Sequence, residues 1–162
     1  MANNPDPTLT LTTSKGVSRT VDDWTTMFHL CLVVLAPIAD AAPWIPIAQR
    51  IFATLGDADC RCAFLVPGNP QIAARLLGPV ESTVLTFVDP DFAFVQSVGL
   101  EHLPAFVHLR QDATLGATAE GWHPHEWQQV ANEVGAAMAW TVPEVSAPTD
   151  PRPTAGWAVS AL

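Results

Sequence analysis

Three short apolar runs, separated by segments with helical periodicity, constrain the fold of this chain most strongly. They lie at residues 30–35, 60–66 and 84–88 and are rich in β-branched side chains. A continuous apolar run of this length is typical of a strand that is buried on both faces of a sheet. Strands that alternate with helices in this way favour parallel pairing with right-handed crossovers. The pattern therefore predicts an α/β fold.

The rest of the chain extends this layout. Asp89 can cap a short helix, because its carboxylate accepts the first free backbone N–H groups. Pro104 then opens a strand, and a turn at Gln111 and Asp112 returns the chain as another strand. Pro124 suits the first turn of a last helix. The further helices expected are 44–55, 71–77, 92–98 and 124–138, and the further strands expected are 105–109 and 115–119.

Length and composition indicate one domain with two short ends. The chain has 162 residues, of which 49% are hydrophobic, and this is ample for a buried core. We expect the domain at residues 21–140, preceded by a segment, 1–20, with a short strand or hairpin around Lys15 and Gly16. Residues 141–162 carry several prolines among Ser, Thr and Ala, which predicts a disordered tail.

The charge balance excludes several classes of partner. The chain has 16 acidic and 7 basic residues, and its net charge is −9. Nucleic acids require clustered Lys and Arg, and anionic membrane surfaces also attract such clusters. We see no basic segment followed by an apolar one at the amino end, and no apolar run long enough to span a bilayer. We therefore expect a cytoplasmic protein that binds neither nucleic acid nor membranes.

Residues 86–122 predict four features in order. These are a helix that ends at Gly99, a strand that begins at Pro104, a hairpin, and a glycine before the last helix. This order resembles the carboxy-terminal half of a thioredoxin-fold domain, and the resemblance extends over residues 20–140. The segment 84–99 is more similar to the peroxiredoxin and thioredoxin-like reductase branch. The resemblance implies a central mixed β-sheet flanked by helices, with a cis-proline at Pro104 that faces the active site.

The active-site cysteines of that family are missing from this chain. In the family, Cys-x-x-Cys follows the first buried strand, at the start of a helix. Aligning Pro46 with the proline of that helix puts Ile38 and Ala41 at the cysteine positions. A peroxiredoxin alignment that starts from Pro37 puts Trp44 at the cysteine position. Because the chemistry requires a thiolate with a depressed pKa, these residues argue for a redox-inactive protein that is not an enzyme.

In the family, the surface beside the cis-proline holds an extended segment of a partner by main-chain pairing. Asp40 lies in the vacant site, and an exposed Trp44 would be a suitable anchor for a partner. We therefore predict a non-catalytic thioredoxin-like protein that binds a protein or peptide, as a chaperone, maturation factor or subunit. The expected partner-binding residues are Asp40, Pro43, Trp44, His102, Leu103 and Pro104.

Two short patches narrow this prediction. Asp22, Asp23 and Trp24 form one patch, and a glycine at 121 followed by His123-Pro124 forms the other. Both patches resemble a cysteine-free, thioredoxin-like accessory protein of hydrogenase maturation. His123 and His125 have the spacing of short metal-binding motifs, but no second group of ligands follows. We expect neither a metal nor another cofactor.

Cys60 and Cys62 favour an alternative function. They are the only close pair of thiols and share one face of the expected strand. As a redox pair they would make the protein a thiol-disulfide oxidoreductase or an antioxidant protein. Neighbours on one strand face are poorly placed for a relaxed disulfide, and buried structural cysteines are the simpler interpretation. Cys31 lies inside the first strand and is expected to be a core residue.

Overall fold

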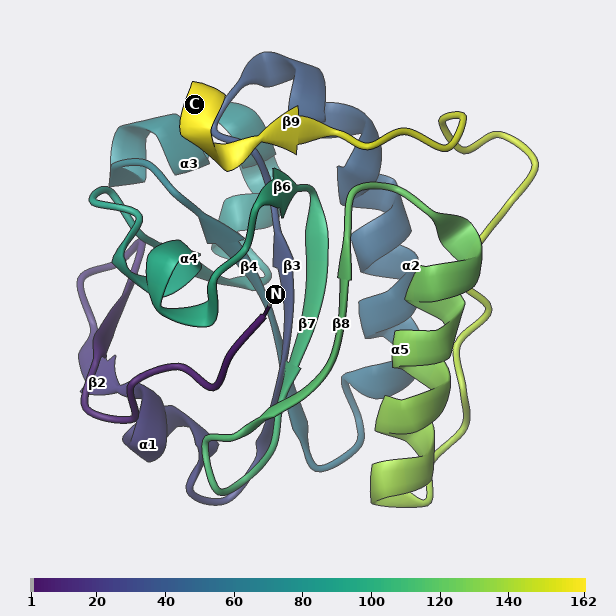
Figure 1. The fold of residues 1–162 in the computed structure, drawn as a ribbon, viewed down its shortest axis with the longest axis horizontal. Helices are drawn as coiled ribbons and strands as arrows, with labels where there is room; N and C mark the ends of the chain where they lie inside the picture. The colour runs from purple at the N-terminus through teal and green to yellow at the C-terminus, as the bar shows by residue number, and fades with distance from the viewer. Residues whose placement is uncertain (1) are drawn as a thin grey trace.

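One mixed β-sheet organises the chain (Figure 1). The computed structural model describes residues 2–162. The sheet has the strand order β2-β1-β5-β4-β3-β7-β8. Neighbours among β3, β4 and β5 are parallel, and the strands towards both edges pair antiparallel. Its strands are β1 (Thr10–Thr13), β2 (Ser18–Thr20), β3 (His29–Val34), β4 (Cys60–Val66), β5 (Leu85–Val88), β7 (Ala105–Leu109) and β8 (Leu115–Glu120).

Helices cover both faces of this sheet (Figure 1). On one face, Phe52 of α2 packs edge-on against Phe64 of β4, and Trp127 of α5 packs against Phe106 of β7. On the other face, Trp24 of α1 packs edge-on against a phenylalanine of β5, and α4 lies on the same side. The helices are α1 (Val21–Thr25), α2 (Ile45–Leu55), α3 (Pro70–Leu77), α4 (Ala93–Val98) and α5 (Pro124–Met138), with short 3₁₀ helices η1 (Ala39–Trp44), η2 (Gly78–Ser82) and η3 (Val159–Ala161).

These elements confirm the predicted α/β fold class with its central mixed sheet. The predicted strands and helices lie within one or two residues of those observed, except at the segment before α2. There the chain first forms η1, because the ring of Pro43 removes one backbone donor. Pro46 then occupies the first turn of α2, where no backbone donor is needed. None of the helices in residues 2–162 has the length and apolar character that a bilayer crossing requires.

The amino-terminal segment belongs to the central sheet. The predicted hairpin around Lys15 and Gly16 is present, with β1 and β2 as its arms. β1 also pairs with β5, so the hairpin extends the sheet. The segment 1–20, predicted to precede the domain, is therefore part of it, because β1 pairs with β5.

The carboxy-terminal segment also differs from the prediction of a disordered tail. Residues 141–162, here called the strap, run along α5 and then across one end of the sheet (Figure 1). The guanidinium of Arg50 donates to the carbonyl of Val145 and forms an ion pair with Asp150 at 2.6 Å. Composition indicated disorder because the strap carries several prolines among Ser, Thr and Ala, but the folded domain supplies hydrogen-bond partners along its path.

A buried carboxylate fixes the start of α4. Asp89 is 6% exposed and accepts hydrogen bonds from the backbone N–H groups of Phe94 and Val95. It therefore satisfies donors that the helix itself leaves free, as the sequence predicted. Since α4 leads directly to the segment that carries Pro104, this cap helps to position the candidate site.

Replacing Asp89 by alanine should lower the free energy of unfolding by about 1–2 kcal/mol, because two buried N–H groups lose their acceptor. Urea unfolding, followed by tryptophan fluorescence, measures the change. Asp91→Ala is the matched control, since Asp91 is exposed two residues further along and caps no described backbone group. Equal effects of the two substitutions would show that the cap contributes nothing.

Candidate functional site

The candidate binding edge is a two-residue strand, β6 (His102–Leu103), directly before Pro104. The peptide bond between Leu103 and Pro104 is cis. β6 is already paired: it forms an antiparallel two-stranded sheet with β9 (Trp157–Ala158) of the strap. The partners in register are His102 with Ala158 and Leu103 with Trp157. The edge expected to hold a foreign segment thus holds a segment of the same chain.

Side chains reinforce this pairing. The indole rings of Trp44 and Trp157 meet edge to face, with centroids 5.6 Å apart. Trp44 is consequently only 6% exposed, whereas the sequence analysis expected an exposed anchor. The Nε1–H group of Trp44 is buried and has no hydrogen-bond partner among the described residues. The strap therefore fills the position beside Trp44 but leaves one buried donor unsatisfied.

Two glycines leave room for the strap. Gly156 has a φ of +74°, and a Cβ atom built there would collide with the carbonyl oxygen of Leu103. Gly121 has a φ of +72°, and a Cβ there would lie 2.9 Å from the carbonyl oxygen of Ala155. Only glycine combines this backbone conformation with such close approach. The domain and the strap are thus complementary at both points.

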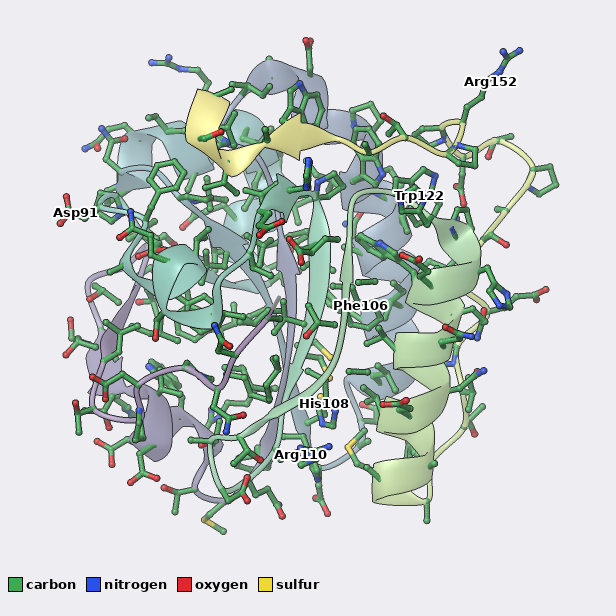
Figure 2. All side chains as sticks on the ribbon, viewed as in Figure 1. Asp91, Phe106, His108, Arg110, Trp122 and Arg152 are labelled. Atoms are coloured by element: carbon green, nitrogen blue, oxygen red, sulfur yellow. The ribbon has the colours of Figure 1, made fainter. Side chains whose placement is uncertain are left out.

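Further hydrogen bonds hold the strap on either side of β9. The backbones of Trp122 and Thr154 exchange two hydrogen bonds, at 2.8 and 2.9 Å. The indole of Trp122, which Figure 2 labels near the start of α5, donates to the carbonyl of Pro151. Beyond β9, the backbone N–H of Val159 donates to the carbonyl of Glu101. The strap is anchored on both sides of Gly156.

The structure separates the six predicted partner-binding residues into two groups. His102, Leu103 and Pro104 lie at the paired edge, and Trp44 contacts the strap opposite them. Asp40 and Pro43 lie on η1 and are exposed. Beside η1, a mostly apolar groove lies between the end of β3 and α3. Its lining residues are Pro37, Ile38, Ala39, Ile72, Arg75 and Leu76.

The three cysteines form a second candidate site, the thiol cluster. The Sγ atom of Cys60 lies 2.9 Å from that of Cys31 and 3.9 Å from that of Cys62. The parallel register of β3 and β4 pairs Cys31 with Cys62, so all three thiols share the sheet face covered by α2 and α5. All three are free thiols. The sequence analysis singled out Cys60 and Cys62 but treated Cys31 as core.

The thiols of this cluster differ in their environments. Cys31 is fully buried and Cys60 is 6% exposed, whereas Cys62 is partly exposed. Hydrogen bonds from the thiols of Cys31 and Cys60 lower the pKa of Cys62. The contacts of Cys31 with the thiols of Cys60 and Cys62, together with burial, raise the pKa of Cys31. Cys62 is thus the thiol that most readily ionises.

A pair of histidines lies next to the thiol cluster. His108 of β7 is in register with Cys31, and its Nε2 atom lies 2.9 Å from Nδ1 of His29. Gly116 of β8 leaves space for the His108 ring, because a Cβ atom there would collide with it. Figure 2 labels His108 and Arg110 at the end of β7 away from the strap. The thiols and histidines therefore lie at the opposite end of the sheet from β6.

No group of three or more His, Cys, Asp or Glu side chains within residues 2–162 is arranged to hold a metal ion. His123 precedes α5 and His125 lies exposed in its first turn, and His125 contacts Gln129 on the next turn. His102 is partly buried at the paired edge. His102 thus lies on a different element from His123 and His125.

Comparisons with known proteins identify the fold. No protein-family model and no curated protein matches this chain. A putative thiol:disulfide interchange protein DsbE from Chlorobium tepidum is 14% identical with a TM-score of 0.69, covering 85% of this chain and 97% of that one. The MTB dsbF protein is 13% identical with a TM-score of 0.64, covering 80% and 95%. The exposed lipoprotein thioredoxin Etrx1 from Streptococcus pneumoniae is 17% identical with a TM-score of 0.61, covering 77% and 98%.

These likenesses confirm the thioredoxin-like fold. The resemblance to the peroxiredoxin branch in particular stays a prediction. In contrast to the fold, the arrangement at the end of β3 depends on this chain's own residues: no cysteine lies in η1 or at the start of α2, and the strap covers Trp44. Sequence reasoning missed the role of Trp157 and Gly156, although a Gly-Trp pair in a polar, proline-rich segment was a signal that part of it is buried.

The histidine pair makes stability depend on pH. Burial, followed by the charges of His29 and Arg110, lowers the pKa of His108 from its ordinary value of 6.5 to about 4. Burial also lowers the pKa of His29, against the opposing effect of Asp59. Between pH 6.5 and 4 the unfolded chain binds protons that the folded protein does not. The contribution of the two histidines to the free energy of unfolding is therefore fully present above pH 6.5, and it is lost as the pH falls towards 4.

Replacing His108 by glutamine should make the free energy of unfolding fall less steeply as the pH decreases from 6.5 to 4. The slope should decrease by about 1 kcal/mol per pH unit, which is what one histidine contributes. Urea unfolding at several pH values between 7 and 4 gives the slope, and the difference between variants is the readout. His125→Gln is the control, because His125 is exposed on α5. A His108→Gln slope equal to that of the wild type would contradict the assignment.

Proposed function

We propose that this protein binds an extended segment of a partner polypeptide at β6, by antiparallel main-chain pairing beside Pro104. The pairing of β6 with β9 supports the proposal, because the backbone groups of this edge already accept an antiparallel segment. A partner segment needs the same backbone geometry and takes the place of β9. Binding is thus an exchange in which the strap is displaced.

The strap has features of a segment that a partner can displace from β6. β9 is only two residues long, and its residues remain partly exposed. The unpaired Nε1–H of Trp44 adds a cost of about 1–3 kcal/mol, the usual penalty for a buried donor without an acceptor. A partner that offers a carbonyl oxygen to this donor removes that cost. The proposal therefore favours a partner that completes the hydrogen bonding of Trp44.

The strap also indicates the chemistry of the partner segment. At the position of Gly156, the carbonyl oxygen of Leu103 leaves no space for a side chain. At the next position an aromatic ring packs against Trp44, as Trp157 does. The partner segment is therefore an extended strand with glycine followed by an aromatic residue. Such a segment suits a chaperone, a maturation factor or a subunit of a larger assembly.

The two patches that resemble a hydrogenase-maturation accessory protein have structural roles here. The Trp24 indole donates to the carbonyl of Leu11 and packs on Phe87. Gly121 gives the strap room to pass. We keep a role in the maturation of another protein as part of the proposal, since the second patch borders the strap.

A thiol-disulfide oxidoreductase is the second candidate function. It is favoured by the names of the similar structures, which describe a thiol:disulfide interchange protein and a thioredoxin, and by the proximity of the three thiols. Since no cysteine lies at the start of α2, such activity would have to use the thiol cluster. Reduction of insulin disulfides by dithiothreitol, with and without the protein, tests it. Acceleration that Cys62→Ser abolishes would establish this second function.

Freeing the edge should allow it to bind a copy of the strap. The probe is a fluorescent peptide with the sequence of residues 151–162. The full-length wild type should bind it weakly, because its own strap acts at an effective concentration in the millimolar range. Gly156→Ala brings a Cβ atom against the Leu103 carbonyl, detaches β9, and should bind the peptide at least about tenfold more tightly. Fluorescence anisotropy measures both affinities.

Gly16→Ala is the matched control, since Gly16 also has a positive φ, of +89°, but a Cβ there meets nothing within 4 Å. This variant should bind the peptide as weakly as the wild type. A peptide with Trp157→Ala should lose affinity for the Gly156→Ala protein. If hydrogen exchange shows that β6 is unprotected in Gly156→Ala and the peptide still does not bind, the proposal fails.

A further inference from the structure

The thiol cluster has the geometry of a reversible oxidation site. Three sulfur atoms from two adjacent strands lie close together, and the thiol of Cys60 contacts both of the others. If the three cysteines were only core residues, their sulfur atoms would not need to lie so close together. The Sγ atom of Cys60 lies 2.9 Å from that of Cys31 and 3.9 Å from that of Cys62. The cluster also lies at the far end of β3 from the edge proposed to bind a polypeptide.

We propose that the thiol cluster is a peroxide-oxidised switch in which Cys62 is the reacting thiol and Cys60 the resolving thiol. Access selects Cys62, because it is the one cysteine of the three that is partly exposed. Proximity selects Cys60, because its Sγ atom lies 3.9 Å from that of Cys62. This inference is independent of polypeptide binding at β6.

The reaction proceeds in two steps with a hydroperoxide as the oxidant. The thiolate of Cys62 attacks one oxygen of hydrogen peroxide, so that an S–O bond forms, the O–O bond breaks and hydroxide leaves, which a proton converts to water. The sulfur of Cys60 then attacks the sulfenic acid of Cys62, and a second water leaves as the disulfide forms. In total two thiols lose two electrons and two protons to one hydrogen peroxide.

The surroundings of the cluster suit both steps. Hydrogen bonds from the other two thiols stabilise the thiolate of Cys62, which is the nucleophile. Shortening the sulfur distance from 3.9 Å to about 2.0 Å takes more than side-chain rotation, because Cys60 and Cys62 are neighbours on one face of β4. The backbone at Arg61 has to bend as well, so the disulfide is strained and readily reduced. Cys31 contacts Cys60 at 2.9 Å but is fully buried, so it holds Cys60 in place and does not meet the oxidant.

Peptide mapping after oxidation distinguishes the three possible disulfides. The full-length protein is treated with hydrogen peroxide, its remaining thiols are alkylated under denaturing conditions, and it is digested with trypsin. Cleavage after Arg50, Arg61 and Arg75 places Cys60 in peptide 51–61 and Cys62 in peptide 62–75. Cys31 lies in peptide 20–50. We expect 51–61 joined to 62–75, alkylation of Cys31 alone, and full reversal by dithiothreitol.

Three single variants test the roles. Cys62→Ser should react with peroxide at least about tenfold more slowly than the wild type. Cys60→Ser should stop at the sulfenic acid, which dimedone labels on peptide 62–75. Cys31→Ser is the control and should still form the disulfide. Thermal unfolding of each variant, with Cys62→Ala as a second substitution, separates lost folding from lost reactivity.

Two results would overturn the inference. One is that all three thiols stay reduced in the folded wild type at peroxide concentrations that oxidise a free cysteine. The other is a disulfide that joins peptide 20–50 to either of the other two, which would make Cys31 a redox partner. A failure of either kind leaves peptide binding by Gly156→Ala unaffected, so the two proposals are tested separately.

Discussion

The register of β3 against its two neighbours determines most of this structure. β3 pairs in parallel with β4 and antiparallel with β7, and from Leu30 onwards it is fully buried. The same register places Cys31 beside Cys62 on one side and beside His108 on the other. At its end, β3 leads to η1 at the same end of the sheet as β6 (Figure 1), and its last residue, Val34, pairs with Ala105. Both candidate sites thus depend on one buried strand, one at each end.

The strap covers the surface beside Pro104 and so limits which partners can bind there. An uncovered β6 would present unpaired backbone groups and an exposed indole, both of which favour unspecific association. The strap covers this edge with two glycine contacts, one aromatic pair and an ion pair further along at Arg50 and Asp150. Any partner that uses the edge competes with a segment that is always present at high effective concentration. Selectivity for a partner then depends on whether the partner accepts the hydrogen bond of the Trp44 Nε1–H group, which the strap leaves without an acceptor.

The thiol cluster differs physically from a redox centre at the start of a helix. At a helix terminus, free N–H groups stabilise a thiolate. The cysteines here lie on strands, so the stabilisation of Cys62 comes from the neighbouring thiols. The amino end of α2, by contrast, begins with proline-containing turns and apolar side chains. The fold has therefore separated the thiols from the position beside Pro104.

Much of the fold could be predicted from the sequence, because periodicity and turn chemistry are local. The β-branched runs, the cap at Asp89 and the prolines in the first turns of α2 and α5 determined the strands and helices and their order. The absence of cysteine near Trp44 was also evident from the sequence alone. The tertiary structure decided what covers Trp44 and which thiols meet. Both depend on contacts between distant residues, Leu103 with Trp157 and Cys31 with Cys60, and composition carries no record of such pairings.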